Sequence, residues 1–485
     1  MRSAFSALLF ALLLAATGPA QTNPKLSPLT RQFVTVDAPV IALIHARVID
    51  GTGAPPRENQ TIVIDHGRIA AVDDAQSAAP PAGAKVLDLK GQTVIPGLVG
   101  MHDHLFYPNQ LAERRAEGPV IIYNEMGFSF PRLYLAGGVT TLRTTGSIEP
   151  YTDLSLKKLI DEGKTPGPNL YITGPYLEGT GSYTPNMHEL TGPKDAARTV
   201  NYWAAEGVTS FKAYMHITRA ELSAAIAAAH AHGLKITGHL CSIGFREAAA
   251  LGIDDLEHGL FVDTEFDPGK KPDVCPAQQL SGDTMAKLDM ESAPVQAMIR
   301  DLVSHHVAVT STMPVFEISV PGRPPLEPRV LSVLSAPAQI DYLMIRALVG
   351  ERTHSNMLTN LHKEMQFERD FVKAGGRLLA GLDPTGYGGV VAGFGDQREV
   401  ELLVEAGFTP VEAIHIATEN GAKFLGQDSN IGTLAPGKDA DLIVIQGDPA
   451  AHIDDIEKVS IVFKDGVGYD SAKLIESVQG AVGMH

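Results

Sequence analysis

In the middle of the chain, short apolar segments alternate with longer amphipathic ones. Eight of the short segments are predicted to be strands, because each is apolar and is bounded by Gly, Pro or polar residues. They span residues 94–104, 139–146, 169–177, 208–215, 234–240, 253–260, 306–313 and 377–384. Amphipathic stretches such as "TRAELSAAIAAAHAHG" separate most of them and predict helices. This alternation indicates an α/β fold with a parallel sheet, and the number eight favours a closed (β/α)8 TIM barrel.

A doubly wound open sheet is the alternative arrangement of such strands and helices. Its usual sequence signature is a G-x-G-x-x-G motif directly after the first strand. The chain has no such motif there. The closed barrel is therefore the preferred interpretation.

The two ends of the chain follow a different pattern, with short alternating strands broken by Gly and Pro. "IALIHARVIDGTGAPPRENQTIVIDHGRIAAV" near the start and "DADLIVIQGDP" near the end are examples. Two β pieces at opposite ends suggest one small β-sandwich built from both termini. We therefore expect a signal peptide over 1–20, sandwich segments over 21–95 and 431–485, and the barrel over 96–430.

The first residues, "MRSAFSALLFALLLAATGPAQT", have the pattern of a secretory signal peptide. One Arg precedes a short apolar run, and small residues lead up to a predicted cleavage site near Ala20. The apolar run is short for a membrane span, so no stable membrane insertion is expected after cleavage. The protein is predicted to be periplasmic or secreted. Its only cysteines, Cys241 and Cys275, are predicted to be unpaired, because a chain of this size does not need a disulfide for stability.

Composition adds one exclusion to this description. With 44% hydrophobic and 20% charged residues, the chain has the composition of an ordinary globular protein. Its formal net charge of −17, without a cluster of Lys and Arg, argues against nucleic acid as a partner. A small-molecule substrate remains the expected partner.

Six polar residues lie at the C-terminal ends of the predicted strands, the face where barrels place their reactive groups. They are His102, His104, Lys212, His239, His258 and Asp383. Each alone has an ordinary explanation, because a strand-end His is usually a satisfied polar residue and a Lys usually reaches solvent. Six on matching strand ends are better explained by a shared metal site, and imidazoles with a carboxylate suit zinc or a similar metal.

Strand geometry refines this expectation. His102 and His104 are two residues apart, so their side chains point to the same side of the strand. Lys212 shares a face with Ser210 and Tyr214, whereas Phe211 and Ala213 point toward the helices. A buried amine close to cations should lose its proton, and a neutral amine can add carbon dioxide to form an anionic carbamate.

This pattern resembles the amidohydrolase superfamily, whose members carry H-x-H after strand one, a carbamylated Lys, two further His and a final Asp. The run "GTLAPGKDADLIVIQGDP" also resembles the family's return into its sandwich domain. The chain is most similar to the imidazolonepropionase-like and prolidase-like branches, which include dipeptidases and N-acyl amino acid hydrolases. It departs from them after strand three, where a Gly-Gly-His is replaced by "LEGTGSYTPNMHEL" (residues 177–190). We expect this loop to overhang the site.

The resemblance implies a binuclear centre. His102, His104 and Asp383 would hold one divalent cation, and His239 and His258 would hold the other. Carbamylated Lys212 would bridge both. The ions would be Zn²⁺, with Mn²⁺, Co²⁺ or Fe²⁺ as alternatives. They would convert a shared water to hydroxide, and Asp383 would act first as general base and then as general acid.

The substrate is less constrained by the sequence. A site with a small positive charge suits a carboxylate-bearing substrate, and candidate anchors are Tyr214, His188 and Arg246. Each also has an ordinary explanation, as a supporting hydrogen-bond donor, a solvated loop residue and a charge on a helix surface. Arg143 could likewise be an anchor or could brace the barrel floor.

The expected function is that of an exported amidohydrolase that cleaves the C–N bond of a dipeptide or an N-acyl amino acid. A lactonase or cyclic amide or imide hydrolase on the same metal site is one alternative. A metal-binding protein without turnover is another, although a structural site is usually closed and four-coordinate. Members of the family commonly self-associate, so a homo-oligomer stays open.

Overall fold

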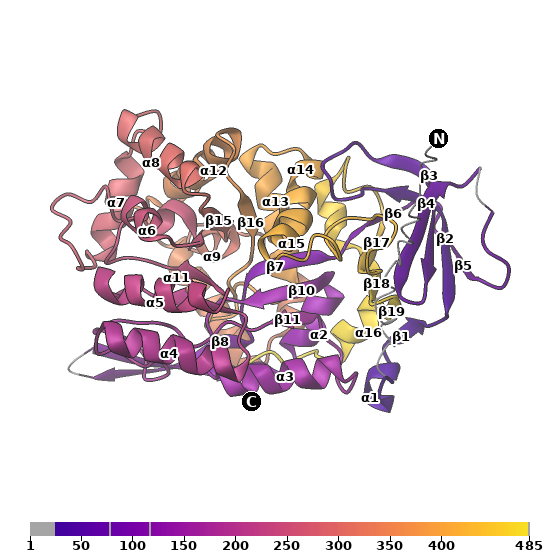
Figure 1. Cartoon of the computed structure of the whole chain (residues 1–485), viewed down its shortest axis with the longest axis horizontal. Helices are drawn as coiled ribbons and strands as arrows, with labels where there is room; N and C mark the ends of the chain where they lie inside the picture. Colours follow the sequence, from indigo (N-terminus) through magenta and orange to yellow (C-terminus); the bar gives the residue numbers. More distant parts are fainter. Residues whose placement is uncertain (1–24, 77–78, 116–117, 484–485) are drawn as a thin grey trace, which may run out of the picture.

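The computed structural model describes residues 25–76, 79–115 and 118–483, and the predicted signal peptide lies outside the described residues. Eight short parallel strands form the centre of the molecule (Figure 1). Each lies within one of the eight segments predicted from the sequence. They are β7 (Leu98–Asp103), β10 (Val139–Thr144), β11 (Asn169–Tyr171), β12 (Ser210–Ala213), β13 (Lys235–Gly238), β14 (Asp255–Glu257), β15 (Ala308–Ser311) and β16 (Leu378–Ala380).

The eight strands close into a barrel. Hydrogen bonds order them as β11-β10-β7 and as β12-β13-β14-β15-β16. A parallel bridge between Thr173 and Ser210 joins the two groups at one seam. At the other seam the backbone N–H of Asp383 donates to the carbonyl of His102 over 3.0 Å. The predicted (β/α)8 barrel is thus confirmed, and the open sheet is excluded.

Gly381 allows the second seam to close. A Cβ at this position would lie 2.4 Å from the Cβ of His102 and 2.5 Å from its backbone nitrogen. Only glycine therefore lets the end of β16 approach β7 so closely. This approach places Asp383, two residues further on, beside His102.

Helices surround the barrel and connect its strands (Figure 1). The stretch predicted to be helical before Leu234 forms α5 (Arg219–Ala231), which begins with a capping box between Thr218 and Glu221. The other helices of this layer are α2 (Phe130–Ala136), α3 (Pro150–Asp161), α4 (Pro193–Glu206), α6 (Phe245–Leu251), α7 (Gln278–Lys287), α8 (Ala293–Ser304), α9 (Met313–Glu317), α10 (Pro328–Val333), α11 (Ala336–Gly350), α12 (Met357–Lys373), α13 (Phe394–Ala406), α14 (Pro410–His415) and α15 (Gly421–Phe424).

Two further short helical turns border the barrel. The 3₁₀ turn η1 (Gly259–Phe261) follows β14, and the π-helical turn η2 (Ile416–Asn420) continues α14. Between barrel and helices lies the main apolar core, which includes Phe211 and Ala213 as the strand alternation predicts. Lys212, between them, is buried on the inner side of the barrel wall.

A nine-stranded sheet from both ends of the chain stands beside the barrel (Figure 1). Its order is β1-β19-β18-β17-β6-β2-β3-β4, with β5 paired to β2. The strands are β1 (Val34–Val36), β2 (Val40–Val48), β3 (Arg57–Asp65), β4 (Arg68–Asp74), β5 (Lys85–Asp88), β6 (Gln92–Pro96), β17 (Leu442–Gln446), β18 (Val459–Lys464) and β19 (Val467–Asp470). Antiparallel pairing of β6 with β17 joins the two ends of the chain. The short helices α1 (Pro28–Arg31), η3 (Ile453–Glu457) and α16 (Ser471–Glu476) flank this sheet in the sequence.

The segment 94–104, predicted as one strand, is divided in the structure. β6 ends at Pro96 in the terminal sheet, and β7 begins at Leu98 in the barrel. Gly97 lies at the break, where a Cβ would be 2.0 Å from the hydroxyl of Thr140. One apolar run thus supplies a strand to each of two sheets.

An antiparallel hairpin of β8 (Phe106–Arg115) and β9 (Gly118–Glu125) is inserted directly after β7.

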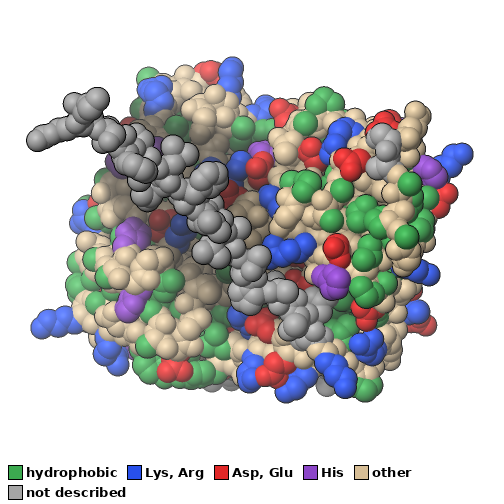
Figure 2. All heavy atoms as spheres, turned by 45° about the vertical axis from the view of Figure 1, so that its right-hand side comes forward, with side chains coloured by type: hydrophobic (Ala, Val, Ile, Leu, Met, Phe, Trp, Pro, Cys, Tyr) green, Lys and Arg blue, Asp and Glu red, His purple; other side chains and the backbone are tan. Residues whose placement is uncertain are grey.

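No helix within the described residues is long and apolar enough to cross a membrane. On the face shown in Figure 2, acidic and basic side chains are interspersed and do not form one basic patch.

Candidate metal centre

The structure brings the six predicted residues together at the C-terminal ends of the barrel strands. His102 belongs to β7 and His104 follows it, whereas Lys212 belongs to β12. The remaining three, His239, His258 and Asp383, follow β13, β14 and β16. Most of these side chains are buried, and the Asp383 side chain keeps 15% of its surface exposed.

Three of the imidazoles are held through Nδ1. His102 Nδ1 donates to a carboxylate oxygen of Glu257 over 2.7 Å, and His104 Nδ1 donates to the carbonyl of Gly146 over 3.2 Å. His258 Nδ1 is hydrogen-bonded to the Thr312 hydroxyl over 2.7 Å. Since a carboxylate and a carbonyl can only accept, Nε2 is the unprotonated nitrogen of His102 and of His104 and carries the lone pair. Such second contacts are the usual way in which proteins orient metal-binding histidines.

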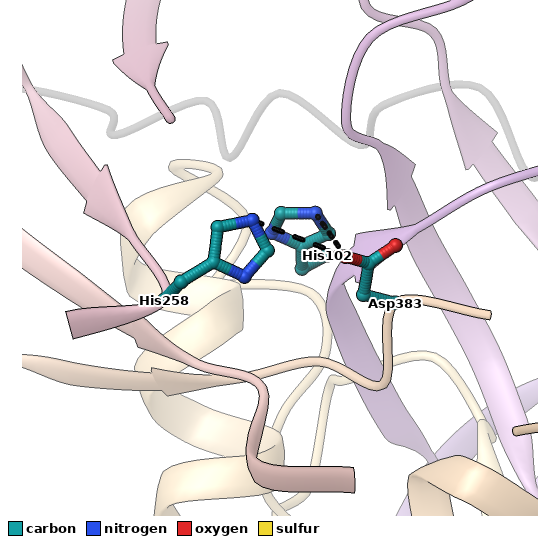
Figure 3. A group of neighbouring side chains, drawn as sticks. All are labelled: His102, His258 and Asp383. Atoms are coloured by element: carbon teal, nitrogen blue, oxygen red, sulfur yellow. Dashed lines mark ion pairs between the residues drawn. The ribbon is translucent and has the colours of Figure 1, made fainter. Parts of the chain in front are cut away.

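The three Nε2 atoms point toward one carboxylate. Oxygens of Asp383 lie 3.8 Å from His102 Nε2, 3.5 Å from His104 Nε2 and 3.9 Å from His258 Nε2. Figure 3 shows His102, His258 and Asp383 converging on one point. One ligand atom from each of these three residues lies within 4.8 Å of the others, a spacing that can hold a metal ion.

Backbone strain accompanies this convergence. His258 has φ of 69° and Asp383 has φ of 50°, in the left-handed region that residues other than glycine rarely adopt. Strand alternation alone would point His258 away from the face that Glu257 occupies. The left-handed conformation instead turns the His258 ring inward, where its centroid lies 4.3 Å from that of His102. Strained residues of this kind concentrate at functional sites.

The donor set fits a divalent cation. Burial lowers the pKa of His102, His104 and His258 well below the usual value, so these imidazoles are neutral. His258 Nε2 is buried and has no hydrogen-bond partner among the described residues. A buried lone pair without a partner is costly, and a bound cation would satisfy it.

Lys212 lies inside this group of ligands. Its Nζ is 3.2 Å from His102 Nε2. Burial lowers the pKa of Lys212 to about 8, although Glu257 and Asp383 act in the opposite direction. A substantial fraction of this amine is therefore neutral near pH 8, which is the form that can react with carbon dioxide.

His239 extends the group on the other side of His258. The two ring centroids are 4.5 Å apart, and burial lowers the pKa of His239 to about 3. The three residues whose ligand atoms lie within 4.8 Å of one another are His102, His258 and Asp383. The family resemblance implies that His102 and Asp383 hold one cation and that His258 holds the other, so this group contains ligands of both. Ligands expected for the two cations, such as His102 and His258, are thus in contact with each other.

Arg143, which from the sequence could be an anchor or a brace, contacts two acids that the sequence did not assign to the site, Asp255 and Glu257. Arg143 is buried and donates to the Met101 carbonyl and to Glu257, 2.9 Å away. It also donates to Asp255 over 3.3 Å. Of the two roles considered for Arg143, the structure shows the bracing one. Asp255 and Glu257 are two residues apart on one strand, and this spacing was a signal that both face the barrel interior.

Two aspartates of the region differ in their surroundings. Burial raises the pKa of Asp383 to about 7, although Lys212 acts to lower it. Asp103 lies beside Asp396, and burial raises the pKa of Asp103 well above its usual value. The group of three residues spaced to hold a metal ion consists of His102, His258 and Asp383 and does not include Asp103.

The three candidate substrate anchors lie in different environments. The ring of Tyr214 is 4.9 Å from that of His239, so it borders the site. His188 is instead half exposed and pairs with Asp195 over 3.0 Å. Arg246 pairs with Glu265 over 2.8 Å and is partly exposed. His188 and Arg246 are thus engaged by carboxylates in the structure, whereas Tyr214 borders the candidate site.

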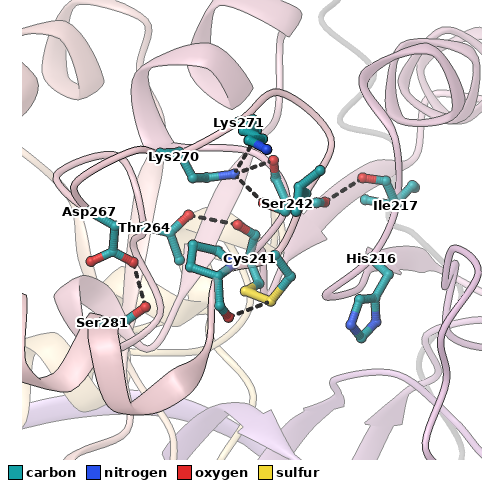
Figure 4. Close-up of a disulfide and its surroundings, with 12 residues drawn as sticks. His216, Ile217, Cys241, Ser242, Thr264, Asp267, Lys270, Lys271 and Ser281 are labelled. Carbon is teal, nitrogen blue, oxygen red and sulfur yellow. Dashed lines mark hydrogen bonds between the residues drawn. A yellow bond between two sulfur atoms is a disulfide. The ribbon is translucent and has the colours of Figure 1, made fainter.

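The two cysteines form a disulfide, so the prediction that they are unpaired is wrong. Cys241 follows β13 two residues after His239, and Cys275 lies 34 residues later with its Cα 4.9 Å away. Figure 4 shows this disulfide at Cys241, with Ser242, Thr264 and Lys270 close by. Thr264 donates to the Cys241 carbonyl over 2.6 Å, and Lys270 Nζ donates to the Ser242 carbonyl over 2.6 Å. These contacts bring the sulfurs together.

Comparison with known proteins gives an independent description of the chain. The sequence model of the Amidohydrolase family matches residues 93–275 and 346–467. A dihydroorotase of Pelotomaculum thermopropionicum is 23% identical over 422 residues, which cover 84% of this chain and 89% of that protein.

Two solved structures are similar over most of the chain. A candidate prolidase from Bifidobacterium longum is 25% identical, with a TM-score of 0.63, and the match covers 90% of this chain and 98% of that one. A Xaa-Pro dipeptidase with bound methionine in its active site is 22% identical, with a TM-score of 0.65. That match covers 89% of this chain and 100% of the dipeptidase.

Proposed function

Because the chain belongs to the amidohydrolase family and is a hydrolase of C–N bonds, we propose that it cleaves the amide bond of a dipeptide or an N-acyl amino acid. The observation that carries this proposal is the convergence of three imidazole Nε2 atoms on the Asp383 carboxylate. The prolidase-like neighbours support the choice of a dipeptide-sized substrate. The dihydroorotase relative favours a cyclic amide as the second candidate.

The residues that would hold two divalent cations are His102, His104, Lys212, His239, His258 and Asp383. When bound, such ions polarise a carbonyl and lower the pKa of water in the site. Zn²⁺ is the expected ion, and Mn²⁺, Co²⁺ and Fe²⁺ suit the same ligands. Glu257 and Thr312 keep the His102 and His258 rings oriented, and Arg143 fixes Glu257 in turn.

Asp383 moves the proton in this proposal. Its carboxylate accepts a proton from the attacking water and returns it to the nitrogen of the leaving amine, while a C–O bond forms and the C–N bond breaks. Lys212 would act as a carbamate, formed when its neutral amine adds carbon dioxide.

Export is also part of the proposal. The disulfide between Cys241 and Cys275 supports an oxidising compartment, because such bonds are rare in the reducing cytosol. The predicted cleavage near Ala20 would release a periplasmic or secreted protein. Sequencing the N-terminus of the exported protein tests this directly, and a mature chain that still begins at Met1 would contradict it.

A substrate screen tests the proposed reaction. Protein loaded with Zn²⁺ or Mn²⁺ in bicarbonate buffer is incubated with dipeptides, N-acyl amino acids, cyclic amides and lactones, and product amines and acids are measured. Turnover of open-chain amides is expected. Turnover confined to cyclic amides would favour the second candidate, and turnover confined to lactones would contradict both.

A further inference from the structure

Aromatic side chains from several segments form one side of the candidate site. They come from the hairpin after β7, from the segment after β11, from the loop over residues 178–190 and from the end of β12. With Ile148 and Met187 they make up an apolar cluster separate from the main core. We call the following six residues the aromatic wall: Phe106, Tyr107, Tyr123, Tyr176, Tyr183 and Tyr214.

The aromatic wall begins where the candidate metal ligands end. The His104 ring centroid is 4.5 Å from that of Phe106 and 5.8 Å from that of Tyr107. On the far side, Tyr214 is 4.9 Å from His239. Lys212 Nζ also lies 5.4 Å from the centroid of the Tyr176 ring. A substrate whose carbonyl reaches the metal ligands therefore has these rings as its neighbours.

The polar atoms of the wall are uncharged hydroxyls. Tyr183 shares a hydrogen bond with Tyr214 at 2.9 Å, and Tyr123 donates to Tyr183 over 3.4 Å. Burial raises the pKa of Tyr176 and Tyr214 well above the usual value, so both phenols keep their protons. Tyr107 and Tyr183 are only partly buried, so the wall reaches the surface of the protein.

Three basic side chains of the described segments around the site are engaged by acids. Arg246 pairs with Glu265, and His188 pairs with Asp195. His216, at the edge of the 178–190 loop, pairs with Glu178 over 3.3 Å. These groups are not poised to select a charged substrate side chain. Aromatic faces also attract cations, but the positive charge of two bound metal ions would oppose a cationic group beside them.

We propose that the aromatic wall binds an uncharged aromatic or bulky apolar group next to the scissile amide, so that the preferred substrates are amides of aromatic amino acids. This inference rests on the proposed amide hydrolysis. Aromatic rings with centroids about 4.5–7 Å apart pack favourably edge to face, and the wall offers several such rings to a ligand ring. The hydroxyls of Tyr183 and Tyr214 can exchange their mutual bond for one to a polar atom of the substrate.

The test compares matched compounds on the wild-type protein. Cleavage of N-acetyl-phenylalanine, N-acetyl-alanine, N-acetyl-aspartate and N-acetyl-lysine by the zinc-loaded protein gives four values of kcat/KM. We expect the value for phenylalanine to exceed that for alanine by about tenfold or more. Equal or better cleavage of the alanine, aspartate or lysine compound would overturn the proposal.

A binding measurement separates failure of this inference from failure of the proposed function. The affinities of phenylalanine and alanine, the products on the amine side, are measured by calorimetry on the same zinc-loaded protein. Tighter binding of phenylalanine by about tenfold supports the wall even if no acetyl amide is cleaved, in which case the proposed reaction alone fails. Equal binding of the two overturns the inference whatever the turnover.

Variants locate the preference. Tyr183→Ala removes a ring of the wall that is not a metal ligand, and Tyr202→Ala removes an exposed ring on α4 as a matched control. We expect Tyr183→Ala to bring the phenylalanine-to-alanine affinity ratio close to one, and Tyr202→Ala to leave it unchanged. Circular dichroism checks that both variants fold. An unchanged affinity ratio in folded Tyr183→Ala would overturn the assignment of the preference to the aromatic wall. If this variant does not fold, the affinity ratio of the wild-type protein alone supports or overturns the proposal.

Discussion

The carboxylate of Glu257 lies 2.7 Å from Nδ1 of His102, and both side chains are fully buried. Burial alone would raise the pKa of Glu257, but Arg143 and Lys212 hold it below the usual value, so Glu257 is a carboxylate. It therefore fixes His102 in the tautomer that presents the Nε2 lone pair to the centre. The neighbouring residue, His258, reaches the same centre through its left-handed backbone.

Glu257→Gln should weaken metal binding without removing a ligand. An amide can no longer orient His102 as a carboxylate does, and lost second contacts typically lower metal affinity by about 10–100-fold. Competition for zinc with a chelator measures this affinity. Glu291→Gln, at an exposed position, is the control and should bind zinc as the wild type does. Wild-type affinity in Glu257→Gln would contradict the orienting role.

Asp383→Asn should abolish most of the turnover. An amide cannot accept and return the proton, and loss of a general acid–base group lowers kcat by about a hundredfold to ten-thousandfold. Steady-state kinetics and metal analysis are done together, with Asp289→Asn on the surface as control. Undiminished kcat in a metal-replete Asp383→Asn protein would rule out the proton-transfer role.

Lys212 should carry a carbamate in the metal-loaded protein. ¹³C NMR of protein prepared in labelled bicarbonate is expected to show one carbamate signal that is absent from Lys212→Met. The variant should also bind less metal, because it lacks the bridging anion. If wild type and variant give the same spectrum and the same metal content, Lys212 is not a bridging ligand.

Removal of the disulfide should destabilise the protein. The bond closes a loop across a sequence separation of 34 residues, for which chain entropy gives a contribution of about 3–4 kcal/mol. Urea unfolding with and without reductant measures the change in free energy of unfolding. A double Cys241→Ala, Cys275→Ala variant controls for other effects of the reductant and should not respond to it. Equal stability of the oxidised and reduced wild type would contradict this prediction.

A buried acid on α12 that is not one of the proposed metal ligands gives a prediction for pH. Burial raises the pKa of Glu368, in α12, from 4.5 to about 8. Between these values the folded protein binds a proton that the unfolded chain does not, so stability falls as pH rises through this window. For one such proton, the free energy of unfolding falls by at most about 1.4 kcal/mol per pH unit.

Glu368→Gln removes this titration and should gain stability relative to wild type as pH rises from 5 to 8. Thermal unfolding of the metal-free proteins at several pH values measures the difference. Glu476→Gln at an exposed position should show no such trend. Parallel curves for wild type and Glu368→Gln would contradict the raised pKa.

Much of the barrel could be predicted because local sequence patterns specify it. Each strand is an apolar run, and helix signals such as the Thr218 and Glu221 capping box have short-range causes. The division of the first segment at Gly97 could not be read, because it depends on a close approach to Thr140 from another strand. The disulfide likewise depends on the fold of a long loop, and its cysteines are far apart in the sequence.

The candidate site was predictable to the extent that strand ends converge in a barrel. The six proposed ligands lie at such ends, so their proximity followed from the fold. The ion pairs of His188 and Arg246 could not be predicted from the sequence, because Asp195 and Glu265 reach these side chains through tertiary contacts. The aromatic wall was missed for the same reason, since its rings come from a hairpin, a loop and strand ends.

Anomalous X-ray diffraction from crystals of the zinc-loaded protein would reveal whether these six side chains hold two divalent cations. Data collected above and below the zinc absorption edge locate bound zinc independently of activity. We predict two peaks bordered by His102, His104, Lys212, His239, His258 and Asp383, with density between them extending from Lys212 Nζ. No peak at this position, or zinc bound only elsewhere on the protein, would show that these six residues do not form a metal centre.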